Sequence, residues 1–263
     1  MNEPPSFPEK SPPVEDAQQE IPPQQPRPVS VALPQSAPYV TYAIIGITVF
    51  VFLLQYATQY IPFIGFDLPA AFFIKSNALI KSGQVWRLFT PALLHGSLTH
   101  IGFNMYALYI FGVGLERHFG HNRFLLLYIL GAFSGNVMSF LFSDANSLGA
   151  STSIFGLIGA EGIFLYQNRK MFAGQFGKAI QNVIFIVVIN LFLGLSPGID
   201  NWGHIGGLFG GLMFAWFAGP VWAVEGIRPM LQLVDKRSLR EVIIGAAMVL
   251  IIFGGLAMWG MMR

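Results

Sequence analysis

The sequence has no cysteine and few charged residues, and each absence excludes a class of protein. Without cysteine, the 263-residue chain has no disulfide, no thiol nucleophile and no sulfur ligand for a metal. Charged residues make up 11% of the chain and hydrophobic residues 54%, whereas soluble domains are about a quarter charged. The net charge of +2 is too small to indicate a nucleic-acid partner. The composition therefore predicts an integral membrane protein, embedded in a lipid bilayer.

The first 37 residues differ from the rest of the chain. They are rich in proline, glutamine and glutamate and poor in aromatic residues. Such a segment cannot bury enough apolar area to offset the entropy lost on ordering. We therefore expect residues 1–37 to form a disordered, proline-rich cytoplasmic tail that serves as a tether. Because this start is polar, we expect no secretory signal peptide and no organellar transit peptide, which favours a bacterial inner membrane.

Seven apolar segments follow the tail, each near the roughly 20 residues that a helix needs to cross a bilayer. The predicted fold class is therefore all-α, a polytopic membrane protein. Residues 61–90 are broken by Pro62, Pro69 and scattered charges, so we expect an interfacial loop there and not an eighth span. The predicted spans are residues 39–60, 92–115, 123–143, 149–167, 179–195, 201–223 and 241–262.

Positive charges are divided unequally between the connections that join these segments. If the amino terminus is cytoplasmic, nine cations lie on cytoplasmic connections and four on the opposite side, with two more in the tail. Cytoplasmic loops carry the excess of lysine and arginine, so this orientation is predicted. The nine are Arg117, Arg123, Arg169, Lys170, Lys178, Arg228, Lys236, Arg237 and Arg240. The four are Lys75, Lys81, Arg87 and Arg263.

Polar side chains inside the apolar segments are few, and such residues usually face the interior of a helix bundle. They are His95, His100, Asn104, Ser151, Glu161 and His204. His100 and Asn104 are four residues apart and so share a helix face. Glu161 is expected to be a protonated, hydrogen-bonded structural carboxyl. Glu116 and Arg117 are expected to secure the end of the second span.

Small residues predict which two helices pack closely. Gly203, Gly207 and Gly211 form a ladder on the sixth segment, and small residues on the fourth segment offer a matching face. Close packing of these helices would bring Ser151 and His204 within hydrogen-bonding reach. A histidine base that takes the hydroxyl proton is what a serine nucleophile needs. The amide of Ser151, unpaired at a helix start, could then stabilise an oxyanion together with neighbouring side chains.

These motifs resemble the rhomboid family of intramembrane serine proteases. The resemblance rests on "GAS" at 149–151 with "FG" four residues after the serine, "HGSLTHIGFN", "VWR" and "HIGGLFGG", in that order. It implies a core of six transmembrane helices over residues 38–223, with a large first outer loop at 61–90. Residues 224–263 would then be a basic cytoplasmic linker and a seventh transmembrane helix.

The resemblance also implies roles for individual residues. Ser151 would be the nucleophile and His204 the general base of a catalytic dyad. The oxyanion hole would consist of His100, Asn104 and the Ser151 amide. Supporting residues would be His95 beside that hole, Phe155 packed on the dyad histidine, and Gly149 of the motif that selects Ser151 over Ser153.

Other features of the sequence stand apart from the dyad. Trp86 and Arg87 match a pair in the first outer loop of the family, or else anchor the loop at the membrane surface. Asp200 is expected to cap the sixth helix with Asn201 and not to complete a triad. Thr152 and Phe155 depart from the glycine and tyrosine that the family often has.

The resemblance implies an endopeptidase that cleaves transmembrane protein substrates within or near the outer leaflet, without a cofactor or a metal. One alternative is a non-catalytic, rhomboid-like protein that binds membrane clients. Another is a transporter or channel that uses His95, His100 and His204 as a proton or metal relay, although no inverted repeat is visible. The identity of the substrates and the oligomeric state stay open.

Overall fold

The computed structural model describes residues 36–227 and 230–263. The expected tail, apart from its last two residues, lies outside the described residues. Seven long helices dominate the described part: α1 (Tyr39–Tyr60), α4 (Leu98–Phe119), α5 (His121–Phe142), α6 (Ser151–Gln167), α7 (Phe176–Leu193), α8 (Asn201–Ala218) and α9 (Leu239–Met261). The predicted all-α polytopic fold is confirmed.

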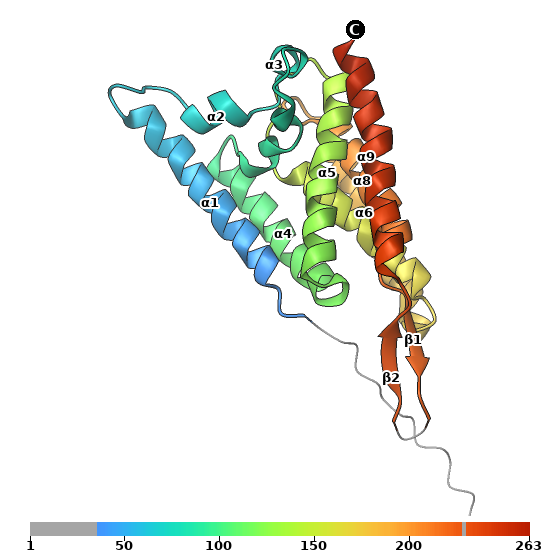
Figure 1. Ribbon diagram of the computed structural model, residues 1–263. Helices are drawn as coiled ribbons and strands as arrows, with labels where there is room; N and C mark the ends of the chain where they lie inside the picture. Colours follow the sequence, from blue (N-terminus) through green and yellow to red (C-terminus); the bar gives the residue numbers. More distant parts are fainter. Residues whose placement is uncertain (1–35, 228–229) are drawn as a thin grey trace, which may run out of the picture. The chain divides into compact units, whose positions relative to one another are not determined.

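Short elements connect the long helices. Between α1 and α4 lie α2 (Leu68–Phe73), α3 (Asn77–Lys81) and two 3-10 turns, Val85–Leu88 and Thr90–Leu93; a third 3-10 turn, Ala173–Gln175, precedes α7. A hairpin of β1 (Trp222–Glu225) and β2 (Gln232–Asp235) joins α8 to α9, with Trp222 paired to Asp235. Figure 1 shows α3 and the end of α9 on one side of the helices and this hairpin on the other.

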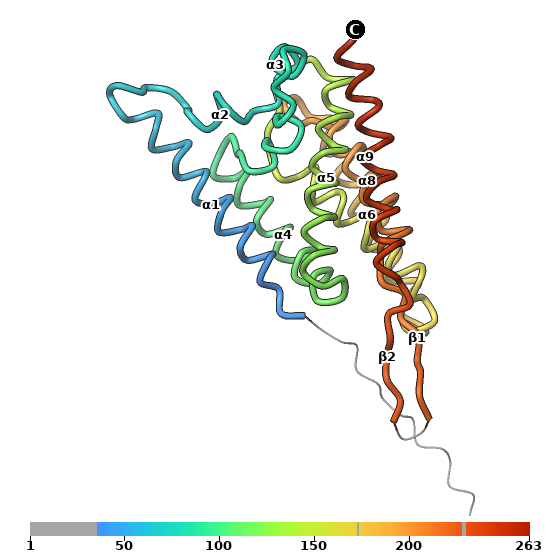
Figure 2. Tube along the Cα trace, viewed as in Figure 1, coloured from blue at the N-terminus to red at the C-terminus, as the bar shows by residue number. Residues whose placement is uncertain are grey.

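Five of the seven long helices, α1, α4, α5, α7 and α9, are long and apolar enough to cross a membrane. The other two, α6 and α8, fall short of that standard. Helix α6 has 17 residues, and the glycines and polar residues of α8 lower its mean hydropathy. These two helices contact each other and α5, and Figure 2 shows them running behind α5 and α9. A helix that other helices enclose needs less apolar surface than one that faces lipid.

Helix boundaries differ from the predicted spans where caps or prolines intervene. Helix α4 begins at Leu98 and not near residue 92, because the Ser97 hydroxyl accepts a hydrogen bond from the His100 amide at 3.1 Å. Helix α8 ends at Ala218 and not at residue 223, since Pro220 cannot continue it.

Glycine lets α8 approach its neighbours closely, as the small-residue ladders predicted. A Cβ atom on Gly207 would collide with the Thr152 carbonyl oxygen, and one on Gly211 would collide with the Gly156 carbonyl oxygen. On another face of α8, a Cβ on Gly206 would lie 2.5 Å from the Ser134 carbonyl oxygen of α5. Only glycine fits at these positions without a shift of backbone, so α8 is held against both α5 and α6.

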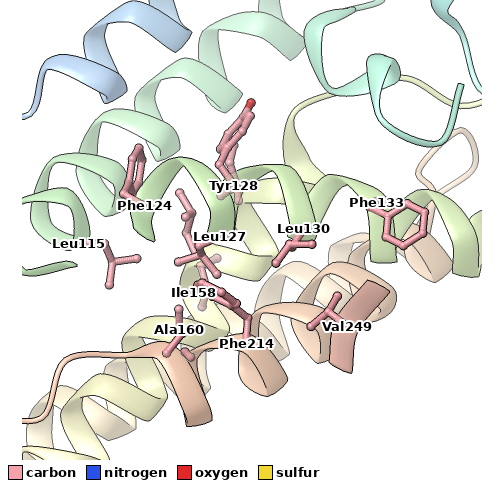
Figure 3. Packing of buried hydrophobic residues seen from close by; sticks show 14 of the residues in the cluster. Leu115, Phe124, Leu127, Tyr128, Leu130, Phe133, Ile158, Ala160, Phe214 and Val249 are labelled. Carbon is pink, nitrogen blue, oxygen red and sulfur yellow. The ribbon is translucent and has the colours of Figure 1, made fainter. Parts of the chain in front are cut away.

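A hydrophobic cluster fills the space between these helices. Figure 3 shows Leu127 and Leu130 of α5, Ile158 of α6, Phe214 of α8 and Val249 of α9 directed toward one another. None of these side chains is more than 3% exposed. Their packing fixes α5, α6, α8 and α9 as one core, which sets the position of every side chain at the start of α6.

A buried carboxylate joins α4 to the start of α1. Glu116 accepts hydrogen bonds from the amides of Val40 and Thr41 at 2.8 and 2.7 Å, and from the Thr41 hydroxyl at 2.6 Å. It also lies 2.6 Å from Nδ1 of His121. The first amides of a helix have no partner within the helix. Glu116 supplies that partner for α1. The sequence indicated a role at the end of α4, the helix that carries Glu116, whereas these bonds reach a different helix.

Candidate active site

Ser151 is the first residue of α6. Gly149, two residues before it, could not be replaced by another residue without strain. Gly149 has φ +134°, a conformation that side chains disfavour. A Cβ atom at this position would lie 2.9 Å from both Cε1 and Nε2 of His100. The glycine thus lets the His100 ring approach the backbone two residues before the serine.

The Ser151 hydroxyl meets His204 across the interface of α6 and α8. Oγ of Ser151 lies 3.0 Å from Nε2 of His204, within hydrogen-bonding distance. Phe155, one turn along α6, stacks on the imidazole with a centroid separation of 4.3 Å and an interplanar angle of 11°. The ring is therefore held flat between helices, with one nitrogen directed at the hydroxyl.

No carboxylate completes a triad within the described residues. Nδ1 of His204 is buried and has no hydrogen-bond partner there. Asp200, one turn earlier, is engaged elsewhere: it accepts from the Gly203 amide at 3.0 Å and from the Ser139 hydroxyl. Asp200 caps α8 as predicted. The prediction that Asn201 shares this role is wrong, because Asn201 is the first helical residue and donates to the Leu191 carbonyl at 2.9 Å.

The other polar residues that the sequence singled out surround the start of α6. His95 is 2% exposed, and its Nε2 accepts a hydrogen bond from the Ala150 amide at 3.4 Å. Its ring packs edge-on against His100, with centroids 4.9 Å apart. Asn104 is close by on α4, but its Nδ2 donates to the His100 carbonyl at 3.0 Å. One N–H of this amide is thus occupied and the second is free to donate.

Ser153 and Glu161 lie on α6 but take no part in this arrangement. Ser153 is fully buried, and its Oγ has no partner within the described residues. The motif selects Ser151 over Ser153, and Ser151 is also the serine whose hydroxyl contacts a histidine. Glu161 lies on α6, and the expected structural carboxyl stays a prediction.

A buried lysine of the first loop fixes the segment that precedes Ser151. Lys75 has no exposed surface, and its Nζ donates to the carbonyls of Ser143 and Ala145 at 2.7 and 2.9 Å. Its backbone exchanges two hydrogen bonds with Ser147, at 3.1 and 3.2 Å. Burial lowers the pKa of Lys75 to about 8, and the nearby Asp200 and Asp144 offset this only in part.

Sequence reasoning counted Lys75 only as a loop cation and missed this contact. The single signal in the sequence is a lysine within the apolar run "AAFFIKSNALI". The same loop is held by Arg87, which is 2% exposed and donates to the carbonyls of Ile74 and Ala71 at 2.8 and 2.7 Å. Trp86 donates to the Phe72 carbonyl at 3.1 Å. These contacts favour a structural role in the loop over a headgroup contact for the Trp86–Arg87 pair.

The described residues contain no group of three or more histidine, aspartate or glutamate side chains placed to hold a metal ion. The chemistry available at the start of α6 is that of a hydroxyl, an imidazole and free helix amides. This combination suits acyl transfer to a serine.

Comparison with known proteins agrees with the fold. The Rhomboid domain family matches residues 82–221, more than half of the chain. The protein belongs to the rhomboid family, a family of multi-pass membrane proteins that includes intramembrane proteases.

Among the relatives, "Rhomboid protease GluP" of Bacillus subtilis is 42% identical over 187 residues, which is 71% of this chain and 35% of that protein. "RHOMBOID-like protein 1" of Arabidopsis thaliana is 40% identical over 138 residues, 52% of this chain and 35% of that protein. "RHOMBOID-like protein 9, chloroplastic" of the same plant is 36% identical over 156 residues, 59% of this chain and 36% of that protein. The chain thus spans about a third of the length of these relatives.

Proposed function

We propose that the protein is an intramembrane serine endopeptidase that cleaves transmembrane protein substrates within or near the outer leaflet. The observation that carries this proposal is the 3.0 Å contact between Ser151 Oγ and His204 Nε2. A serine hydroxyl becomes a useful nucleophile when a base accepts its proton during attack. Similarity to a named rhomboid protease supports the same activity.

The proposed reaction uses one proton carrier in two steps. As Oγ of Ser151 attacks the peptide carbonyl, Nε2 of His204 takes the hydroxyl proton. His204 then gives that proton to the leaving amine, and an acyl group stays on the serine. A water molecule, deprotonated by the same nitrogen, attacks this ester; His204 then returns the proton to Oγ of Ser151 as the ester bond breaks, which releases the second product and restores the dyad. Stacking on Phe155 keeps the imidazole in place through both steps.

Negative charge on the carbonyl oxygen must be stabilised as the tetrahedral intermediates form. The start of α6 supplies the Ser151 amide together with the positive end of the helix dipole. The His100 ring lies against Gly149, two residues before the serine. The free N–H of Asn104 would complete the oxyanion hole, and His95 would support it by bonding the Ala150 amide.

A cleavage assay tests the proposal. Purified protein in lipid vesicles is incubated with a transmembrane substrate that carries a glycine or proline in its span, because an intact helix hides its carbonyls. Ser151→Ala and His204→Ala should each lower the rate by at least about a thousandfold. Ser153→Ala is the matched control and should retain activity, since Ser153 contacts no histidine. Equal cleavage by the wild type and Ser151→Ala would refute Ser151 as the nucleophile, and cleavage by neither would favour the non-catalytic client-binding alternative.

The orientation of the chain is also proposed. The excess of cations on one set of connections, nine against four, supports a cytoplasmic amino terminus. Ser151 would then open toward the opposite side, where the substrate's outer-leaflet end lies. Because the chain has no cysteine, Phe63→Cys and Ile227→Cys each introduce a single thiol. An impermeant maleimide added to intact cells should label position 63 and not position 227. The bacterial inner membrane stays a prediction.

A further inference from the structure

A cavity lies at the end of the helices away from Ser151. Its volume is about 780 Å³, it is open on one side, and it is lined by the turn between α4 and α5, the first part of α9 and the start of β1. Figure 1 shows the end of α4 and the beginning of α9 on the same side of the molecule. Specific binding sites for small molecules have volumes of about 300–1,000 Å³. The cavity is large enough for part of a lipid.

The end of the cavity near the α4–α5 turn is polar and positively charged. Arg117, Arg123 and Asp235 line it, so its fixed charges sum to +1 before any histidine is protonated. Asp235 is paired with Arg123 at 2.5 Å. The Arg117 guanidinium forms no ion pair with the described residues. One cation is thus left over for a ligand.

Two buried polar atoms at the same end also have no partner among residues 36–227 and 230–263. They are Nε1 of Trp222 and Nδ1 of His118, and both residues line the cavity. A buried donor without an acceptor is destabilising. The indole N–H and the Arg117 guanidinium are both donors. An anion with several acceptor oxygens, such as a phosphate, would serve both.

The opposite wall of the cavity is apolar. Val242, Ala246 and Leu250 are four residues apart and therefore lie along one stripe of α9. Ile243 and Leu126, the latter on α5, extend this surface. From residue 242 to residue 250 the stripe is about 12 Å long, at 1.5 Å per residue. It continues from the charged end along the helix in the direction that an acyl chain takes from its headgroup into a bilayer.

We propose that this cavity binds an anionic glycerophospholipid. Its phosphate would accept hydrogen bonds from Arg117 and Trp222, and an acyl chain would lie along the α9 stripe. The charged end favours an anion, and the apolar stripe beside it fits an anion that carries a hydrocarbon chain. The proposal does not depend on peptidase activity.

Native mass spectrometry of the full-length protein tests this site. The protein is released from nanodiscs of phosphatidylcholine mixed with phosphatidylglycerol, and the retained lipid is identified. Phosphatidylglycerol should be retained preferentially over phosphatidylcholine. Arg117→Gln should reduce that retention about fivefold. Arg240→Gln removes the same charge from an exposed residue of the first turn of α9 that does not line the cavity, and it should leave retention unchanged.

A third variant addresses the apolar wall. Ala246→Phe fills the stripe and should also lower retention of phosphatidylglycerol, with no change in the charge of the protein. Equal retention of both lipids, or an equal loss in Arg117→Gln and Arg240→Gln, would overturn the proposal. So would displacement of the lipid by millimolar inorganic phosphate, which would indicate a site for a free anion. A photo-crosslinker at position 246 that captured residues 1–35 would assign the cavity to the tail instead.

Discussion

Replacing the buried Lys75 should change how the protein's stability depends on pH. The ordinary pKa of a lysine is 10.5, and burial lowers that of Lys75 to about 8 in the folded protein. Between pH 8 and 10.5 the unfolded chain therefore holds a proton at this position that the folded chain has lost. The free energy of unfolding of the wild type should rise with pH across this window. A shift of this size corresponds to roughly 3 kcal/mol.

Lys75→Met removes both the titration and the hydrogen bonds. The two bonds from Nζ to the Ser143 and Ala145 carbonyls are worth about 1.5–3 kcal/mol each, as bonds to a charged group. Because methionine has no ammonium group to bury, the variant regains roughly 3 kcal/mol in free energy of unfolding at pH 7. The two effects oppose each other, so the net loss of stability at pH 7 should be no more than about 3 kcal/mol.

The effect on the loop should be larger than the effect on global stability. Residues 143–147 lose the side chain that holds them to the first loop, and this segment leads directly to Ser151. Amide hydrogen exchange at residues 143–149 should accelerate in Lys75→Met, with little change in α5 or α8. Proteolytic turnover, if present, should fall because the nucleophile is placed less precisely.

Unfolding in detergent at pH 7, 8.5 and 10 provides the measurement. Other tyrosines and lysines titrate over the same range, so the quantity of interest is the difference between wild type and variant at each pH. The free energy of unfolding of the wild type, relative to that of Lys75→Met, should rise by up to roughly 3 kcal/mol as the pH rises. Lys75→Arg, which stays charged throughout, should also lack the wild-type rise. Parallel pH profiles for all three proteins would refute the assignment of a buried, titrating Lys75.

Other substitutions have equally specific outcomes. Gly207→Ala should lower the free energy of unfolding by about 1–3 kcal/mol or more, seen as a lower thermal midpoint, because its Cβ collides with a backbone carbonyl; Gly254→Ala, with open space around it, should not. Glu116→Gln should cost roughly 2 kcal/mol, seen as earlier unfolding, since the amides at the start of α1 lose a charged acceptor. Phe155→Leu should lower turnover about tenfold with little loss of stability, because the His204 ring loses its stacking partner. Unchanged values for Gly207→Ala, Glu116→Gln or Phe155→Leu, or a drop for Gly254→Ala, would contradict these arguments.

Local patterns in the sequence predicted the helical part of the fold well. The spacing of Gly203, Gly207 and Gly211 indicated a close helix contact, and the structure places that face against Thr152 and Gly156. Such ladders are informative because only a backbone-to-backbone contact requires glycine at every fourth position. The meeting of Ser151 and His204 follows from that contact, since both residues lie at the same end of their helices.

Features that depend on tertiary contacts were not predictable in the same way. Lys75 appears in the sequence as an ordinary loop cation, and its burial arises only when the loop folds onto residues 143–147. Glu116 caps a helix 75 residues away from it in sequence, which no local pattern encodes. The hairpin at 222–235 lies in a segment that looked like a helix end and a linker, because a two-stranded ribbon has little periodic signal of its own.

The central claim is that Ser151 is a nucleophile activated by His204. Its most direct test is treatment of the membrane-embedded protein with a fluorophosphonate, followed by mass spectrometry of the peptide that contains residues 148–162. The account predicts a single phosphonylated residue, Ser151, and loss of labelling in His204→Ala while a Ser153→Ala variant still reacts. A folded wild-type protein that stays unmodified, or an adduct on Ser153, would contradict it.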